Sequence, residues 1–206
     1  MRGIAFIGGE GPRAGRCRAL AEGADILAAA DSGLMAAEDA GLRPDWIIGD
    51  MDSLDELRRL EKYPPGRVIR YSHDKDHTDT ELALALLWEK GCDETWLIGG
   101  GGGRTDHLLA IRALFDRERC PERWITAADD IRCVRDRVSL TLPPGSRVSV
   151  FPAGSGPWRA KSRGLRWPLD GVAWKGGSFG ISNIAPEGAF FIRAEAGRFL
   201  VISPRE

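Results

Sequence analysis

The 206-residue chain has the composition of an ordinary globular protein, with 43% hydrophobic and 29% charged residues. Its 29 basic and 30 acidic residues give a formal net charge of −1, and a chain without a positive field has little attraction for nucleic acid or anionic lipid. No apolar run approaches the roughly 18 residues of a membrane-spanning helix. Glycine and proline interrupt the N-terminal segment before a signal peptide could form. We therefore expect a cytoplasmic protein with no nucleic-acid or membrane partner.

In the first part of the chain, short apolar runs alternate with segments of helix length, a pattern typical of strands joined by helical crossovers. Because the runs are continuously apolar, we expect a parallel sheet covered on both faces. A helix is predicted over residues 78–90, where Thr78 and Glu81 form a capping box. The six predicted strands are residues 4–8, 25–30, 46–49, 67–71, 95–99 and 123–128.

After residue 128 the pattern changes to short alternating segments such as 138–142, 147–151 and 190–194, separated by glycine- and proline-containing turns. This pattern predicts strands without helices. We therefore expect an α/β domain over residues 1–128, followed by a small all-β sandwich domain over residues 129–206.

The four cysteines are scattered, contain no CxxC pair and do not lie at zinc-finger spacing from the histidines. We interpret them as free thiols in apolar surroundings. They are Cys17, Cys92, Cys120 and Cys133.

Acidic residues or glycines follow four successive predicted strands, in the motifs DSG, GDMDS, DKDHTDTE and GGGGGRTDH. Ligands of an open parallel sheet bind beyond the carboxyl ends of its strands, where helix N-termini also point. Asp50 and Asp52 supply the oxygen ligands that Mg²⁺ prefers, and this ion commonly brings nucleotide phosphates with it. The alternative is that this segment only opens a helix, with Ser53 and Glu56 as a capping box.

The third and fourth motifs leave similar alternatives open. The negative charge of Asp79, in the first turn of the predicted helix, interacts favourably with the helix dipole, which is a sufficient role without any ligand. Asp76 is equally consistent with a solvated loop charge. Lys75 either balances the negative charge of a bound phosphate or is exposed to solvent. The glycine run from Gly99 to Gly103 permits backbone N–H groups to approach an anion, and Arg104 suits phosphate oxygens. Asp106 either holds Arg104 or reaches a metal, and His107 either contacts phosphate or is structural.

Taken in order, DSG, PDWIIGDMDS, DKDHTDTELAL, GGGGGRTDHLLA, GLRWPL and SN resemble the motifs of the thiamine pyrophosphokinase family. The resemblance extends from Asp31 to about Pro204. It implies transfer of a diphosphate from ATP to the hydroxyl of thiamine, with Mg²⁺ as cofactor and AMP as the second product. It also implies a homodimer with shared active sites, in which the first domain binds ATP and Mg²⁺ and the second binds thiamine and dimerises.

The resemblance assigns roles to residues of this chain. The acids that match the family's ligands of Mg²⁺ and the phosphates are Asp50, Asp52 and Asp79. The residues that match positions bordering the ATP site are Asp31, Asp76, Arg104, Asp106 and His107. Trp167 matches a tryptophan that stacks on thiamine, although a core position is the alternative, and Ser182 and Asn183 match a pair near the substrate. Met51 and Ile111 depart from the family pattern, where phenylalanine and asparagine are common.

Two other functions remain open on the sequence. Since Ile111 removes a polar group near the expected site, the acceptor could be another hydroxymethyl heterocycle, such as 6-hydroxymethylpterin. A non-catalytic module that senses nucleotide or thiamine is the second alternative, but it has no use for so many acids at strand ends.

Overall fold

The computed structural model describes residues 1–51, 57–72, 74–175 and 177–205. The chain separates into two compact units, one formed by residues 1–114 with 124–127 and the other by residues 115–123 with 128–206. Residues 115–123, which the sequence analysis placed in the first domain, therefore group with the second unit. Each unit is described on its own below.

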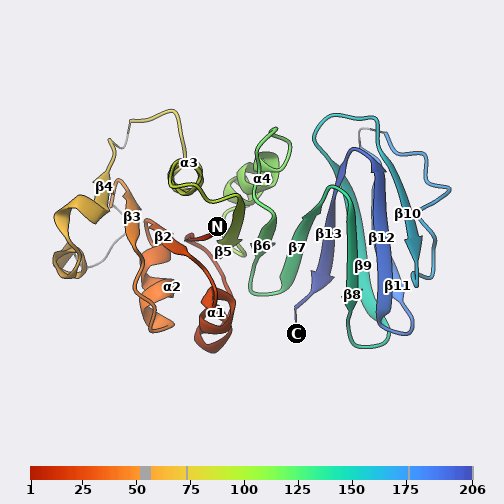
Figure 1. Ribbon diagram of the computed structural model, residues 1–206, viewed down its shortest axis with the longest axis horizontal. Coiled ribbons are helices and arrows are strands. Elements are labelled where there is room, and N and C mark those ends of the chain that lie inside the picture. The colour runs from red at the N-terminus through yellow and green to blue at the C-terminus, as the bar shows by residue number, and fades with distance from the viewer. Residues whose placement is uncertain (52–56, 73, 176, 206) are drawn as a thin grey trace. The chain divides into compact units, whose positions relative to one another are not determined.

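The first unit is built on a sheet in the order β4-β3-β2-β1-β5-β6, with helices alternating with the strands along the chain (Figure 1). The pairs of β1 with β2 and β5, of β2 with β3, and of β3 with β4 are all parallel. The strands are β1 (Arg2–Phe6), β2 (Ile26–Ala30), β3 (Trp46–Gly49), β4 (Val68–Arg70), β5 (Glu94–Ile98) and β6 (Arg123–Ile125). All six predicted strands are present, with ends that differ by up to three residues.

The α-helices of this unit are α1 (Ala14–Ala21), α2 (Gly33–Asp39), α3 (Asp79–Glu89) and α4 (Thr105–Leu114), and the 3-10 helices are η1 (Leu57–Lys62) and η2 (Pro65–Arg67). The predicted capping box of α3 is confirmed: the backbone N–H of Thr78 donates to the Glu81 carboxylate at 2.8 Å, and the Thr78 hydroxyl accepts from the Glu81 N–H at 3.3 Å. This cap, one residue before Asp79, fixes Asp79 as the first residue of α3.

The core of the first unit lies between the sheet and its helices. Strands β1, β2, β3 and β5 are almost continuously buried, as expected of parallel strands covered by helices. Residues from β1, α1 and α2 form one buried cluster, and a second joins β2 and β3 to Leu34, Leu60 and Tyr63. Helix α3 packs across β1, β2 and β3, so it bridges several strands of the sheet.

The second unit consists of two antiparallel sheets, in the orders β7-β13-β9-β11 and β10-β12-β8. Its strands are β7 (Asp129–Val134), β8 (Arg137–Thr141), β9 (Ser146–Ala153), β10 (Arg159–Arg163), β11 (Gly180–Ala185), β12 (Ala189–Ala196) and β13 (Arg198–Pro204). One buried cluster joins residues of both sheets, including Val150, Ile192 and Phe199. The fold class predicted from the sequence, an α/β domain followed by a small β-sandwich, is confirmed.

None of the helices in these described ranges has the length and hydrophobicity required to cross a membrane.

Candidate active site

Asp31 lies directly after β2 in a backbone conformation that few side chains adopt, with φ +52°. Its N–H donates to the Ile48 carbonyl at 2.9 Å, and its Oδ1 accepts from the Met51 N–H at 3.2 Å. Gly49 leaves room for this carboxylate, because a Cβ at Gly49 would lie 2.8 Å from Asp31 Oδ1. The glycine at the end of β3 therefore allows an acid from the neighbouring strand to lie against it.

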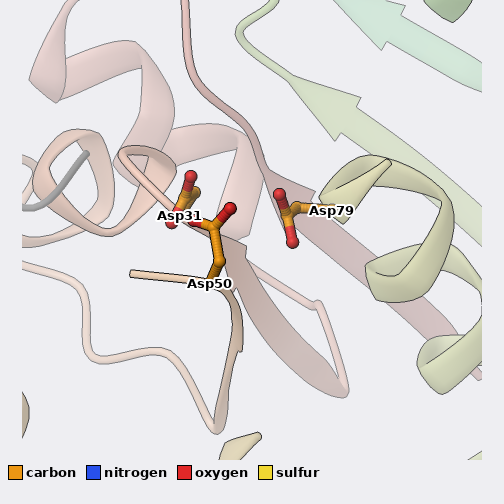
Figure 2. Close-up of side chains that lie close together, drawn as sticks. All are labelled: Asp31, Asp50 and Asp79. Carbon is orange, nitrogen blue, oxygen red and sulfur yellow. The ribbon is translucent and has the colours of Figure 1, made fainter. Parts of the chain in front are cut away.

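Asp50 and Asp79 meet Asp31 from two other segments. Strands β2 and β3 are parallel neighbours with Ala30 opposite Ile48, so Asp50 leaves the sheet beside Asp31. Asp79 is the first residue of α3, and the helix carries it to the same edge. One carboxylate oxygen from each of the three residues lies within 4.8 Å of the other two, and Figure 2 shows the three side chains turned toward one another. We call these residues the acid triad.

Lys75 lies against the acid triad. Its Nζ is 2.8 Å from Asp79 Oδ1 and 3.9 Å from Asp50 Oδ2, and its side chain is only 14% exposed. Burial lowers the pKa of Lys75, but the contact with Asp79 and the charges of Asp79, Asp50 and Asp31 outweigh burial, so the pKa is raised. The ammonium therefore remains charged at neutral pH and neutralises part of the triad.

The acid triad fits a hard divalent cation. In an octahedral Mg²⁺ site, adjacent oxygen ligands lie about 3 Å apart and opposite ones about 4.2 Å apart, so the three oxygens, which lie within 4.8 Å of one another, would close in by up to about 2 Å around an ion. Asp79 Oδ1 is shielded from solvent, and a buried carboxylate requires a positive partner. Three carboxylates that face one ammonium within the described residues suit a divalent cation.

Other predicted acidic ligands are not in this group. Asp52, and the Ser53–Glu56 capping box proposed as its alternative, lie outside the described residues. Asp76 is exposed on the loop before α3 and is not part of the triad. Asp31, which was predicted to border ATP, has a carboxylate oxygen within 4.8 Å of those of Asp50 and Asp79, so it could serve as a ligand beside them. The signal was present in the sequence, since DSG and GDMDS follow strands that pair side by side.

The glycine run after β5 is engaged largely with the protein itself. The N–H groups of Gly99, Gly100 and Gly101 donate to the carbonyls of Ile125, Gly8 and Glu10, at 2.9, 2.8 and 3.0 Å. A Cβ at Gly99 would lie 2.2 Å from the Ile7 carbonyl oxygen, so this glycine is required for close packing. In the described chain, no comparable backbone hydrogen bond is found for the N–H groups of Gly102 and Gly103. The contact expected between the glycine run and an anion is therefore narrowed to the N–H groups of these two residues.

Arg104 and Asp106 form a two-point ion pair at the start of α4. Arg104 Nη2 donates to Asp106 Oδ2 at 2.5 Å, and Nε donates to Oδ1 at 3.2 Å. The hydrogen bond from Arg104 lowers the pKa of Asp106 to about 2. Asp106 thus holds Arg104, and the acid triad does not include it. His107 is exposed on α4. Ile111 is buried, and its Cδ1 would lie 2.6 Å from a Cβ at Gly100, so it packs beneath the glycine run.

Trp167 lies in the second unit and is 54% exposed, so the alternative of a sandwich-core position is wrong. The buried amide of Asn183 holds its backbone: Nδ2 donates to the Trp167 carbonyl at 2.6 Å, and Oδ1 accepts from the Trp167 N–H at 3.1 Å. Ser182, next to Asn183, has φ +58°, and its N–H donates to Ser149 Oγ at 3.1 Å. Asn183 therefore contributes by fixing the place of an exposed tryptophan.

Comparisons with known proteins match this chain to one protein family. A family model described as "Thiamin pyrophosphokinase, catalytic domain" matches residues 17–120. The thiamine pyrophosphokinase of Bacillus subtilis (strain 168) is 42% identical over 88 residues, which are 41% of this chain and 41% of that protein. The matched segment thus spans about two fifths of this curated relative.

Solved structures resemble the chain over its full length. A crystal structure of thiamine pyrophosphokinase from Bacillus subtilis superposes with a TM-score of 0.79 at 24% identity, covering 99% of each chain. A thiamin pyrophosphokinase structure from Candida albicans gives a TM-score of 0.75 at 16% identity, covering 99% of this chain and 90% of the other. At these identities the likeness shows the shared fold.

Proposed function

Because the chain belongs to the thiamine pyrophosphokinase family, we propose that it transfers a diphosphate from ATP to the hydroxyl of thiamine, giving thiamine diphosphate and AMP. The acid triad is the observation that carries this proposal. Three carboxylates from separate segments converge at the carboxyl ends of parallel strands, where α/β sheets bind their ligands. Mg²⁺ would be held by these carboxylates while it also binds the phosphates of the nucleotide.

In this proposal, Asp31, Asp50 and Asp79 hold Mg²⁺, and Asp52 remains a predicted fourth ligand from the family motif. When bound, the ion neutralises phosphate charge and orients the polyphosphate. The chain's own contribution is positioning. Gly49 leaves space for the Asp31 carboxylate, and the Thr78 cap sets the start of α3 and thus the place of Asp79.

The phosphate contacts are proposed to come from a small set of donors. Arg104 is exposed and is held in place by Asp106, so its remaining N–H groups are available for phosphate oxygens. Gly102 and Gly103 have left-handed φ values of +62° and +60°, and consecutive N–H groups in such turns can form an anion-binding concavity. These groups meet the negative charge of the β-phosphate as the thiamine hydroxyl attacks the β-phosphorus in line and AMP leaves.

Thiamine is proposed to stack on Trp167, whose exposed ring presents a face to a cationic heterocycle. The guanidinium of the adjacent Arg166 lies 5.6 Å from the centre of this ring, a cation–π contact that supports the proposal. Asn183 acts as a positioning residue through the Trp167 backbone. Ser182, the other member of the serine–asparagine pair, is also proposed to lie near the substrate.

We also propose the homodimer with shared active sites that the family resemblance implies. Support comes from three large apolar side chains of the second unit, Trp167, Phe179 and Ile181, which are 54 to 60% exposed. Exposed apolar side chains of this size commonly mark an interface or a binding site. Sedimentation of the full chain at micromolar concentration tests the dimer, and a monomer at every concentration would contradict it.

The function is tested by product identity. The purified chain is incubated with ATP, Mg²⁺ and an equimolar mixture of thiamine and 6-hydroxymethylpterin, and AMP and the phosphorylated acceptor are quantified. Thiamine diphosphate formed in equal amount to AMP is the expected result. Pterin diphosphate as the product would favour the other acceptor, and no AMP under any condition would favour a sensing module. Asp52→Asn, with saturating Mg²⁺ and ATP, is expected to abolish most turnover.

A further inference from the structure

Two cysteines of the second unit lie close together. The Sγ atoms of Cys120 and Cys133 are 3.7 Å apart, although the residues are 13 positions apart in the sequence. The backbone brings the two segments together, since the Cys133 N–H donates to the Glu122 carbonyl at 2.9 Å. Cys120 is buried, whereas Cys133 is partly exposed, so a small molecule can approach the pair from the Cys133 side.

Two guanidinium groups lie against the Cys120 sulfur. Arg135 Nη2 is 3.0 Å from Cys120 Sγ, and Arg198 Nη1 is 3.4 Å from it. Both arginines are anchored elsewhere: Arg198 donates to the carbonyls of Asp116 and Glu118, and Arg135 pairs with Glu122. Two fixed positive groups at hydrogen-bond distance favour a thiolate over a thiol.

The hydrogen bond with Cys133 and the charges of Arg135 and Arg198 lower the pKa of Cys120 in spite of its burial. The pKa of Cys133 is raised by that same contact and by burial. Because the Arg135 and Arg198 guanidinium groups lie against Cys120 Sγ, we assign the thiolate to Cys120 and the thiol to Cys133.

From this arrangement we propose that Cys120 and Cys133 form an oxidisable thiol pair, a modification site in which Cys120 reacts with a peroxide and Cys133 closes a disulfide. No other pair of cysteines in the described chain is recorded in contact. This site is independent of the phosphate chemistry proposed for the first unit.

The reaction balances with one peroxide molecule. The Cys120 thiolate attacks one oxygen of hydrogen peroxide, the O–O bond breaks, and hydroxide leaves, forming a sulfenic acid. The Cys133 sulfur then attacks the sulfenic sulfur, the S–O bond breaks, and water leaves as the disulfide forms. Two thiols and one peroxide give one disulfide and two waters. The sulfurs need to approach by about 1.7 Å to reach the length of a disulfide bond.

The other two cysteines provide matched controls within the same chain. The Cys17 thiol donates to the Pro12 carbonyl at 3.2 Å, and Cys92 is fully buried. Both are free. A peroxide that oxidised thiols indiscriminately would modify them at a rate comparable to that of Cys120.

The test treats the reduced full-length chain with hydrogen peroxide and follows intact mass and alkylation of each cysteine. We expect a mass loss of about 2 Da, a Cys120–Cys133 cross-link in peptide maps, and intact thiols at Cys17 and Cys92. Cys133→Ser is expected to stop at a sulfenic acid on Cys120 that dimedone traps. Equal oxidation of Cys17 or Cys92, or oxidised protein without the cross-link, would overturn the proposal.

A second variant tests the role of the guanidinium. Arg135→Gln is expected to slow the loss of the Cys120 thiol about three- to tenfold, because less of it is thiolate. Arg137→Gln is the control, since Arg137 is exposed and contacts only the exposed Asp136 carboxylate among the ion pairs recorded for it. An unchanged rate in Arg135→Gln, with the melting temperature retained, would show that the arginine does not activate this sulfur.

Discussion

The two units each contain a partly buried cluster of charge, and the two clusters are balanced in opposite ways. In the second unit, the Asp130 carboxylate is held by two guanidinium groups, with Arg123 Nε at 2.7 Å and Arg132 Nη2 at 3.1 Å. In the first unit, the Lys75 ammonium is the cation found against the three carboxylates of the acid triad among the described residues. In the described part of the chain, two cations therefore face one acid in the second unit, whereas one cation faces three acids in the first.

This difference separates a structural ion pair from a binding site. Burying an unmatched charge costs folding free energy, whereas a buried carboxylate with matched hydrogen-bond donors avoids most of that cost. Concentrating acids without enough cations is therefore expected where an external cation completes the site. We accordingly expect mutations in the acid triad to affect catalysis, and mutations around Asp130 to affect stability.

The largest effect is expected from Asp79→Asn, which keeps the shape of the side chain and removes its charge. Losing one preorganised electrostatic contact commonly costs about 2.7 to 4 kcal/mol of barrier, so turnover should fall on the order of a hundred- to thousandfold, measured as AMP release at saturating Mg²⁺ and ATP. The melting temperature of the cation-free protein should change by no more than about 4 °C, because one lost ion pair is offset by less repulsion.

Asp39→Asn is the matched control for this measurement, since Asp39 is an exposed acid at the end of α2 in the same unit. It should retain full turnover. If Asp79→Asn retains near-normal turnover as well, the triad has no catalytic part and the proposed function loses its main support.

Asp130→Asn should show the opposite behaviour. Removing this carboxylate leaves Arg123, whose residue is 9% exposed, without its buried counter-charge. Breaking a buried pair in this way commonly costs about 3 kcal/mol or more, equivalent to a fall of roughly 6 to 12 °C in melting temperature. Turnover per folded molecule should be unchanged. Thermal unfolding and AMP release, measured on the same preparation, separate the two effects, and lost turnover without lost stability would contradict a structural role.

The pH dependence of stability follows from the same pair. Burial opposes ionisation of Asp130, but the hydrogen bonds and charges of Arg123 and Arg132 outweigh it, so the pKa of Asp130 is lowered. A lowered folded-state pKa means that the stabilisation is fully present above the ordinary value of about 4 and is lost as the pH falls through the folded-state value. The stability difference between wild type and Asp130→Asn should therefore shrink below about pH 4. A difference that stays constant down to pH 2 would exclude the ion pair as its cause.

The sequence predicted features that depend on local pattern. Continuous apolar runs identified the strands, and the Thr78–Glu81 spacing predicted the start of α3 because a capping box involves only one helical turn. Acids and glycines at strand ends indicated the right edge of the sheet, since parallel strands deliver their carboxyl ends together. The convergence of Asp50 and Asp79 could be anticipated for this reason.

Features that depend on distant neighbours could not be predicted. Whether Lys75 faced solvent or the acids depended on the path of its loop, and whether the Gly99–Gly101 N–H groups were available depended on carbonyls of Ile125, Gly8 and Glu10. Asn183 holds a backbone 16 residues away. The pairing of Cys120 with Cys133 likewise required knowledge of which segments lie side by side. A residue type suggests a chemistry, but only tertiary contacts show which of its groups are already used.

A smaller effect, on binding, is expected from the exposed tryptophan and its positioning residue. Trp167→Ala should raise the KM for thiamine about 2- to 30-fold, the equivalent of the 0.5 to 2 kcal/mol of a cation–π contact, with little change in the KM for ATP. Asn183→Ala should act in the same direction while leaving the tryptophan in place, because two backbone hydrogen bonds that hold it are lost. An equal rise in both KM values would indicate a damaged fold.

The smallest effect, and the most direct test of the charge imbalance, is expected from Lys75→Met. Without its ammonium the acid triad repels itself, so the melting temperature of the cation-free protein should fall by about 2 to 4 °C, corresponding to roughly 1 kcal/mol. The stabilisation gained on adding Mg²⁺ should be larger than in the wild type, because a site without the Lys75 ammonium is more negative and binds a cation more tightly. Lys161→Met is the control: Lys161 pairs with Glu195 at 2.9 Å on an exposed strand, so its loss should leave the response to Mg²⁺ unchanged. If both variants respond to Mg²⁺ as the wild type does, Lys75 is an ordinary loop lysine and the triad is not short of positive charge.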